Sequence, residues 1–312
     1  MLELIKVIMP VFGIIFLGFL AVSLKLIGKD QLKSLGMYVI KIALPCILVV
    51  NISAQKISDL WQPQYLLSYG LVSFALFSLL LWLYRRQFNQ PLNQAAVFAM
   101  GGSMSNTGFI GGATLHLILG PSAAIYFAMT FIIENFIVFL MFLVCLEMHA
   151  QKQAKLIEMI GPTLRSILKN PIIIALCLGV GLSALQIQLP ILLKQILEPV
   201  GKTAGPLGLF VVGGSLYGIR SLKNIGRDAS IIFISKMLCM PVLVYLLFLC
   251  MPNTNPEMIF AGVLLSSISM VTMFTVFGQS FEIGEKTSAI LLLCTLANIF
   301  TVSTVITLLL PK

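Results

Sequence analysis

Long apolar runs follow one another along the whole chain, separated by short polar connections. Most runs approach or exceed about 20 residues, the length at which a helix crosses a bilayer. None alternates polar and apolar positions, as a barrel strand would. We therefore predict an all-α polytopic membrane protein with about ten transmembrane helices. Their ranges are Leu2–Leu24, Ser34–Ser53, Pro63–Tyr84, Leu92–Leu119, Ser122–Met148, Pro171–Ile187, Ile191–Tyr217, Ala229–Cys250, Pro256–Gln279 and Thr287–Leu310.

The composition excludes a soluble globular protein. Hydrophobic residues make up 59% of the 312 positions and charged residues only 10%, which leaves too little polar surface for a water-soluble domain. The six cysteines fall in or at the ends of apolar runs without a CxxC pair, so we interpret them as packing residues. Neither HExxH nor GxSxG occurs, and we predict no catalytic residue, no metal site and no cofactor.

Basic residues gather in every second connection between the predicted helices. Such an excess marks the cytoplasmic side, so we expect a multi-pass protein of the cell inner membrane with both termini outside. The asymmetry also accounts for the net charge of +9 without a nucleic-acid partner. The residues on the predicted cytoplasmic side are Lys25, Lys29, Lys33, Arg85, Arg86, Lys152, Lys155, Arg165, Lys169, Arg220, Lys223, Arg227 and Lys286.

A polar connection over 149–170 divides the chain into two sets of five predicted helices. Aligning Leu32–Ser53 with Leu193–Gly214 gives eight identical residues in 22, including Lys and Pro pairs at one constant offset. This pattern indicates an internal duplication. Because five is odd, the second copy must enter the membrane from the opposite side. We therefore predict two inverted five-helix repeats, 1–148 and 171–312, joined by a cytoplasmic linker. Such repeats are characteristic of secondary transporters.

One stretch interrupts the fourth predicted helix. The sequence GGSMSNTGFIGG, Gly101–Gly112, is rich in glycine and small polar residues. With Phe98 aligned on Phe260, the duplication places it over VLLSSISMVTMF, Val263–Phe274, in the ninth helix. Small polar side chains satisfy the backbone groups that a broken helix releases. We predict that helices four and nine are discontinuous and cross near the middle of the membrane; close helix packing at the glycines is the alternative.

The predicted breaks also indicate a kind of ligand. Each helix that restarts after a break presents an N-terminus with about half a positive charge and unpaired N–H donors, which favour an anion. A carboxylate fits such a site. The sequence therefore predicts a small organic anion as substrate, held between the two breaks.

The string SMSNTGFIGG in a fourth helix, ten helices in two halves and outward termini resemble the auxin efflux carrier family. That family comprises bacterial permeases for malonate- and malate-like acids and the plant auxin exporters. The resemblance implies a scaffold-and-transport arrangement in which the fourth and ninth helices cross at the substrate site. Many members carry proline in the crossover and plant members a long cytoplasmic loop, and this chain lacks both. The residues that match the family's first crossover are Ser105, Asn106, Thr107, Gly108 and Gly111.

Two hydroxyl residues of the second break, Ser269 and Thr272, complete the predicted substrate-binding set. Hydroxyls and unwound carbonyls also suit Na⁺. A Na⁺-coupled symporter or a channel of related fold is therefore the alternative to an anion carrier, and either H⁺ or Na⁺ is open as the coupling ion. An intramembrane enzyme is disfavoured because the nucleophile and metal-ligand motifs are missing. Whether the protein forms a homodimer is left open.

Polar residues within the predicted helices are further candidates. Glu134 and Asn135 lie near the centre of the fifth helix, where a carboxylate is costly and is expected to face the protein interior. Glu134 is a candidate for carrying a coupling proton, with a structural hydrogen bond as the alternative. Asn298 is its approximate counterpart in the tenth helix and a candidate for lining the same cavity.

Three lysines also fall inside predicted helices. Lys41 and Lys202 are related by the repeat. One of them is a candidate for attracting an anionic substrate or for neutralising Glu134; the alternative is that their side chains extend to the membrane interface. For Lys236 we adopt the second interpretation, an extended side chain with its charge at the interface. Together these features predict a secondary carrier of small organic anions that works by alternating access around helices four and nine.

Overall fold

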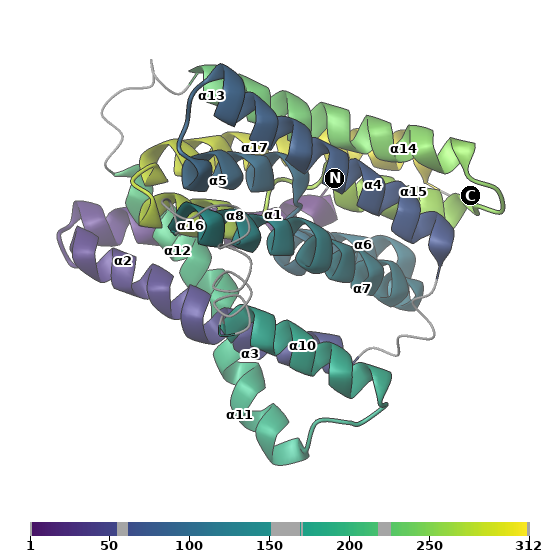
Figure 1. Cartoon of the computed structure of the whole chain (residues 1–312), viewed down its shortest axis with the longest axis horizontal. Helices are drawn as coiled ribbons and strands as arrows, with labels where there is room; N and C mark the ends of the chain where they lie inside the picture. Colours follow the sequence, from purple (N-terminus) through teal and green to yellow (C-terminus); the bar gives the residue numbers. More distant parts are fainter. Residues whose placement is uncertain (1, 55–61, 151–168, 170, 218–225, 311–312) are drawn as a thin grey trace.

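Every regular element in the computed structural model is a helix (Figure 1). The structure describes residues 2–54, 62–150, 169, 171–217 and 226–310. The predicted all-α class is confirmed for these residues. The predicted linker lies almost entirely outside the described residues. So do five of the basic residues assigned to the cytoplasmic side, namely Lys152, Lys155, Arg165, Arg220 and Lys223.

Helices occupy each of the ranges expected from the apolar runs. In the first half they are α1 (Leu2–Ser23), α2 (Lys29–Tyr38), α3 (Leu44–Ser53), α4 (Pro63–Trp82), α5 (Leu92–Ser103), α6 (Gly112–Leu119), α7 (Ala123–Ile133) and α8 (Leu140–Ala150). In the second half they are α10 (Pro171–Ala184), α11 (Ile191–Lys202), α12 (Ala204–Leu216), α13 (Gly226–Phe233), α14 (Met240–Cys250), α15 (Pro256–Ser267), α16 (Met273–Ser280) and α17 (Gly284–Leu309).

Five continuous helical stretches among the described residues are long and apolar enough to cross a bilayer. They are Asp30–Ser53, Pro63–Gln87, Ile125–Ala150, Gly226–Cys250 and Gly284–Leu309, and shorter apolar helices accompany them. Large apolar side chains such as Phe16, Leu249 and Phe300 are exposed on the outside of the fold, where lipid provides an apolar surrounding. The arrangement is that of a multi-pass membrane protein, and the inverted order of its two halves stays a prediction.

Several helices contain or end in π-helical turns: η1 (Val39–Ala43), η6 (Glu134–Phe139) and η7 (Ile234–Cys239) join two helices, η3 (Leu83–Gln87) ends α4, and η4 (Thr107–Gly111) leads into α6. Such turns insert extra backbone into a helix and occur frequently at functional sites. Here three of them carry ionisable residues that the sequence places inside apolar runs. Lys41 lies in η1, Glu134 in η6 and Lys236 in η7.

The helices pack as two groups (Figure 1). The first group consists of α1–α3 and α10–α12, and the second of α4–α8 and α13–α17. In the first group α1 packs mainly on α12, and α3 packs on α10 and α11. In the second group α4 packs on α5 and α14, α5 on α8, and α15 on α14 and α17. The groups meet chiefly where α12 contacts α16 and α17 and where α2 contacts α16. This division matches the scaffold-and-transport arrangement that the sequence resemblance implies.

The first group is held together by an unusually close approach of two backbones. A Cβ atom at Gly18 of α1 would lie 2.0 Å from the carbonyl oxygen of Phe210 in α12. A Cβ atom at Gly213 of α12 would lie 1.8 Å from the carbonyl oxygen of Ile15. Only glycine permits this spacing, and small residues at such contacts are how membrane helices pack in the absence of a hydrophobic driving force.

Candidate functional site

Two helix breaks face each other in the interior of the second group. Helix α5 ends at Ser103 and α15 ends at Ser267, and in each case the next residue has extended backbone angles. The two extended segments pair as an antiparallel bridge. The N–H of Asn106 donates to the carbonyl of Ser269 at 2.7 Å, and the N–H of Val271 donates to the carbonyl of Met104 at 3.2 Å. The predicted discontinuities and their meeting are confirmed, and they form without proline.

The alignment of the halves that the sequence indicates near the breaks is wrong by two residues. Helices α5 and α15 have the same length, and 164 positions separate Leu92 from Pro256 and Ser103 from Ser267. Placing Phe98 over Phe260 assumes a separation of 162 positions. The error arises because apolar residues are interchangeable along a buried helix, so that two matching phenylalanines outweigh the correct position of the break.

Glu134 supports the first break from the neighbouring π-helical turn. Its side chain is 1% exposed, which agrees with the expectation that it faces the protein interior. Oε1 accepts the N–H of Ser105 and the hydroxyl of Tyr69, both at 2.8 Å, and Oε2 accepts the hydroxyl of Thr107 at 2.7 Å. Three donors directed at one carboxyl group favour its ionised form and offset much of the cost of burying it.

Lys236 does not extend to the membrane interface, and that prediction is wrong. The side chain is completely buried, and its Nζ donates to Ser105 Oγ at 2.6 Å and to the Ser266 carbonyl at 2.8 Å. The Sδ atom of Met240 lies 3.0 Å from the same nitrogen. These three acceptors can take all three hydrogens of an ammonium group. Ser105 lies between Lys236 and Glu134 and is hydrogen-bonded to both.

The two charges match the ends of the broken helices. Lys236 contacts the last turn of α15, where free carbonyls give a helix a partial negative charge. Glu134 contacts Ser105 and Thr107, where the chain of the first break turns back into a helix and carries partial positive charge. Charge placement therefore stabilises both breaks, and the pair as a whole adds no net charge to the membrane interior.

A cavity of about 210 Å³ opens beside the breaks, between the two groups of helices. One wall comes from α3, the end of α11 and the start of α12 in the first group. The other wall comes from the two breaks and from η6 in the second group. Both walls carry polar residues among apolar ones. The lining residues predicted from the sequence are Ser105, Asn106, Gly108, Glu134, Asn135, Lys202 and Thr272.

The other predicted residues lie away from this cavity. Asn298 is completely buried in α17 and does not line the cavity; its Oδ1 accepts the N–H of Ser269 at 2.8 Å. Thr107 is occupied by Glu134, and Gly111 packs so that a Cβ would lie 2.9 Å from Leu265 Cδ2. Lys41 is exposed and is likewise absent from the lining. Asn298, Thr107 and Gly111 therefore support or pack against the breaks, whereas Lys41 has no part in this site among the described contacts.

Lys202 contributes a positive charge at the cavity, but not in contact with Glu134. Its Nζ lies 2.6 Å from Glu198 Oε1, one helical turn earlier on α11, and 68% of its side chain is exposed. The expected role of neutralising Glu134 falls to Lys236 instead. Because its pair with Glu198 is exposed, Lys202 keeps the freedom to turn toward an anion in the cavity.

Asn106 presents an unsatisfied amide to the cavity. The residue is 3% exposed, Nδ2 donates to Thr272 Oγ1 at 3.3 Å, and Oδ1 has no partner among the described residues. Turning the amide around would leave the nitrogen free instead, so one end is available in either orientation. A buried amide atom without a partner is costly, which makes Asn106 a candidate for contacting a ligand.

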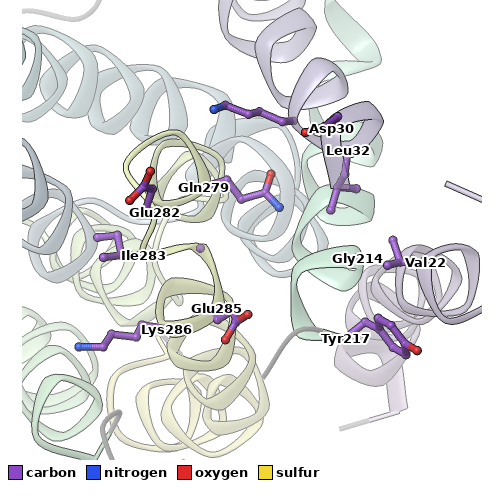
Figure 2. Close-up of a pocket in the computed structure, with 12 residues that line it drawn as sticks. Val22, Asp30, Leu32, Gly214, Tyr217, Gln279, Glu282, Ile283, Glu285 and Lys286 are labelled. Carbon is purple, nitrogen blue, oxygen red and sulfur yellow. The ribbon is translucent and has the colours of Figure 1, made fainter. Parts of the chain in front are cut away.

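A larger second cavity, of about 500 Å³, also lies between the two groups (Figure 2). Val22, Asp30 and Leu32, from α1 and α2, lie across from Gln279 and Glu282 at the end of α16 (Figure 2). This end of the fold carries the α1–α2 and α16–α17 connections, which the distribution of basic residues assigns to the cytoplasmic side. Between the two cavities α12 approaches the second break, where a Cβ at Gly208 would lie 3.0 Å from Thr272 Cγ2.

Comparison with known proteins agrees with this geometry. The model of the family described as "Membrane transport protein" matches residues 3–307. The chain belongs to this family, that of the auxin efflux carriers. As a member of the membrane transport protein family it is a multi-pass membrane protein that acts on a small-molecule substrate in a lipid bilayer, and the resemblance seen in the sequence is confirmed.

Two relatives extend the comparison. The chain is 27% identical to a protein of Rhizobium meliloti (strain 1021) named "Putative malonate transporter" over 308 residues, which cover 97% of this chain and 95% of that one. It is 22% identical to the lysosomal cholesterol signaling protein of Mus musculus over 256 residues, which cover 77% of this chain and 29% of that much longer protein. The full-length match makes the first relative the more informative of the two.

Sequence reasoning misses one residue of the site and misassigns another. Tyr69 has the appearance of an aromatic packing residue in α4, and Lys236 is interpreted from the sequence as a lysine whose charge extends to the membrane interface. Both are identified only by their contacts with Ser105, which lies 36 residues from Tyr69 and 131 from Lys236 along the chain. A usable signal for Lys236 is its depth in an apolar run, because an intramembrane lysine is functional by default.

Proposed function

We propose that this chain is a secondary carrier of small carboxylates that moves its substrate by alternating access of the cavity beside the helix breaks. The position of that cavity carries the proposal. Its walls belong to two separately packed groups of helices, so a rocking movement of one group against the other opens it first to one side of the membrane and then to the other. The second cavity lies toward the predicted cytoplasmic side, and we assign it as the entrance that this movement connects to the site.

The size of the cavity favours a small substrate. A volume of about 210 Å³ corresponds to about seven water molecules at roughly 30 Å³ each. Sites for drug-sized ligands start at roughly 300 Å³. A three- or four-carbon diacid fits this space, and bulkier acids require the walls to move apart.

The polar groups of the cavity favour an anion. Lys202 brings a positive charge, and the start of α16 follows directly after Thr272. Asn106 can donate its amide N–H to an anion once the amide is turned so that Oδ1 accepts from the Thr272 hydroxyl. Helix N-termini of this kind attract carboxylates. The charge of Glu134 is offset by Lys236 through Ser105, so it does not by itself exclude an anion. The name of the full-length relative, a malonate transporter, supports the same class of substrate.

The layout of the carrier belongs to the same proposal. We infer two inverted five-helix repeats in the cell inner membrane with both termini outside. The repeat is supported by matching contacts in the two halves, since the N–H groups of Ser105 and Ser269 each bond a side chain 29 residues further along, and its inversion follows from the odd number of helices in each copy. The orientation is supported by the distribution of lysine and arginine.

Uptake by the purified protein in liposomes tests the substrate class. Radiolabelled malonate, malate and indole-3-acetate are compared with a neutral diol and an amine of similar size, each with and without a pH or Na⁺ gradient. We expect saturable uptake of malonate and malate and none of the diol or amine. Saturable uptake of the amine or the diol in preference to every acid would overturn the carboxylate assignment. The gradients separate H⁺ coupling from the Na⁺-coupled alternative.

A further inference from the structure

Ser105 connects the cavity to a cation that the cavity does not reach. Glu134 and Ser105 line the cavity, whereas Lys236 is completely buried and is not part of the lining. Lys236 Nζ donates to Ser105 Oγ at 2.6 Å, Ser105 Oγ lies 3.0 Å from the Tyr69 hydroxyl, and that hydroxyl donates to Glu134 Oε1 at 2.8 Å. The four groups form one continuous hydrogen-bonded chain, which we call the Lys236–Glu134 chain.

The hydrogen positions along this chain have one consistent direction. An ammonium group has only donors, so Ser105 Oγ accepts from Lys236 and its own proton is free to point to Tyr69. Tyr69 then donates to Glu134, whose ionised carboxyl has only acceptors. The other contacts of Glu134, from Ser105 N–H and Thr107 Oγ1, are donors as well. Lys236 and Glu134 thus cancel in charge, and each is fully hydrogen-bonded.

The tyrosine and cysteine side chains around the Lys236–Glu134 chain carry no charge at physiological pH. Tyr65 and Tyr69 of α4 face Glu134, and Cys294 of α17 faces Lys236. Tyrosine and cysteine ionise normally near about 10 and 8.5. Tyr126 of α7 and Cys145 of α8 belong to the elements packed around Glu134 and are equally uncharged. Lys202 is the one further charge among the cavity-lining residues, and its partner is Glu198.

We propose that Glu134 takes up one proton whenever a carboxylate enters the cavity, which makes the protein an anion–proton symporter with Lys236 as its permanent counter-charge. The inference rests on the proposed carboxylate transport. An incoming carboxylate beside Glu134 places two negative charges together, which strongly favours protonation of one of them. The proton comes from water on the side to which the cavity is open, binds a Glu134 carboxyl oxygen, and leaves with the substrate on the other side.

The balance of charge explains why proton uptake by Glu134 beside Lys236 is compatible with a site in the middle of a membrane. The empty site holds Lys236 as ammonium and Glu134 as carboxylate, with no net charge. The loaded site holds the same ammonium, a neutral Glu134 and one substrate carboxylate, again with no net charge. The second carboxylate of a diacid such as malonate is offset by Lys202, which also lines the cavity. Moving the site from one side to the other therefore exposes no unpaired charge to the low-dielectric interior in either state.

The surroundings of Glu134 favour H⁺ over Na⁺ as the coupling ion. A sodium ion needs several oxygen atoms with free lone pairs directed at it. Around the Glu134 carboxyl the neighbouring groups are N–H and O–H donors, whose hydrogens would point at the metal. Protonation instead requires only that one of these hydroxyls rotate and accept.

Tyr69 and Ser105 act on the proton site as positioning residues. Tyr69 is the better test because removing its hydroxyl leaves a phenylalanine of nearly the same shape. Tyr65 provides the matched control: it is one turn earlier on α4, equally buried, and stacked on Tyr69 with ring centroids 6.1 Å apart. Its hydroxyl bonds Thr130 Oγ1 at 2.6 Å and is not part of the Lys236–Glu134 chain.

The experiment measures malonate and protons together in liposomes that contain the purified protein and a pH-sensitive dye. We expect malonate entry to carry one proton per malonate, and Glu134→Gln to abolish this proton movement per malonate transported, whatever rate remains. In Tyr69→Phe the carboxylate loses a donor that favours its ionised form, so the decline of uptake with rising pH shifts to higher pH. Tyr65→Phe leaves the pH profile where it is in the wild type.

The outcomes separate this inference from the function on which it rests. Malonate transport without proton movement, or proton movement that persists in Glu134→Gln, would overturn the symport while leaving the carrier in place. Equal pH profiles for Tyr69→Phe and the wild type would remove the Lys236–Glu134 chain from the coupling even if Glu134→Gln fails to fold. Absence of transport for every carboxylate would instead overturn the proposed function itself.

Discussion

Ser105 and Ser269 make the same contact in the two halves of the chain. The N–H of Ser105 donates to Glu134 Oε1 and the N–H of Ser269 donates to Asn298 Oδ1, both at 2.8 Å and both across 29 residues. Each break thus has its first free N–H satisfied from further along the chain, by η6 in the first half and by α17 in the second. One half supplies a carboxylate at the cavity and the other a neutral amide away from it. Support of the break is common to both halves, and the charge is particular to Glu134.

The contact in the second half makes a prediction about stability. Replacing Asn298 by alanine leaves the Ser269 N–H buried without this acceptor, at a cost of roughly 1–3 kcal/mol. We expect a lower midpoint of thermal unfolding in detergent. Thr304→Val, on the exposed side of the same helix, is the control and is expected to unfold near the wild-type temperature. Equal unfolding midpoints for the two variants would contradict the structural role of Asn298.

The close approach of α1 and α12 gives a second prediction about stability. In Gly18→Ala the added carbon meets the backbone of Phe210 and forces the helices apart, so we expect a cost of roughly 1–3 kcal/mol, as for overpacking in a core. Gly13 lies on the same helix with open space around its Cβ position. Gly13→Ala should be neutral or slightly stabilising, because alanine is the better helix former. Thermal unfolding of both variants in detergent distinguishes these effects; a tolerated Gly18→Ala would refute the tight contact.

Asn106 is the residue from which we expect the largest effect on substrate affinity. Alanine removes the one amide that faces the cavity with an unsatisfied end. A hydrogen bond to a charged group is worth roughly 1.5–3 kcal/mol, which corresponds to a loss of affinity of about ten- to 150-fold. The measurement is the malonate concentration for half-maximal uptake. Ser269→Ala, in the opposite break but outside the cavity lining, should weaken affinity far less. A similar loss in both variants would contradict the assigned site.

The exposed pair of Lys202 and Glu198 predicts opposite effects from its two members. Glu198→Gln frees Lys202 to turn toward the anion, so the apparent affinity for malonate should rise by about twofold; Lys202→Gln should lower it similarly. Both effects should shrink in high salt, which screens exposed charges. Lys194→Gln on the same helix controls for a general loss of positive charge. If Lys202→Gln and Lys194→Gln change the apparent affinity for malonate equally, Lys202 has no specific role at the cavity.

The fold is largely readable from the sequence, since the apolar runs and the observed helices coincide to within a few residues. The first break is readable as well, because a cluster of glycine, serine and asparagine at Gly101–Gly112 has little reason to exist inside a packed membrane helix. Glu134 is predictable for a similar reason: an isolated carboxylate in an apolar run must find partners in the interior.

The partners themselves are not readable from the sequence. Lys236 has the same sequence context whether its side chain extends to the interface or is buried, and the acceptors that decide the matter come from other helices. The role of Tyr69 is not readable either, because a tyrosine in a membrane helix is usually interpreted as a packing residue. For Lys41 and Lys202 the predicted repeat suggests too much. The two lysines align with each other in the sequence, but only Lys202 lines the cavity.

Counterflow of malonate tests the carrier mechanism most directly. Liposomes that contain the protein are loaded with unlabelled malonate and diluted into a trace of labelled malonate. A carrier that exposes one site alternately to the two sides must exchange one for the other, so label should accumulate transiently inside above its outside concentration, and Asn106→Ala should lose this overshoot. Label that only equilibrates, at a rate proportional to its concentration, would show a channel and contradict alternating access.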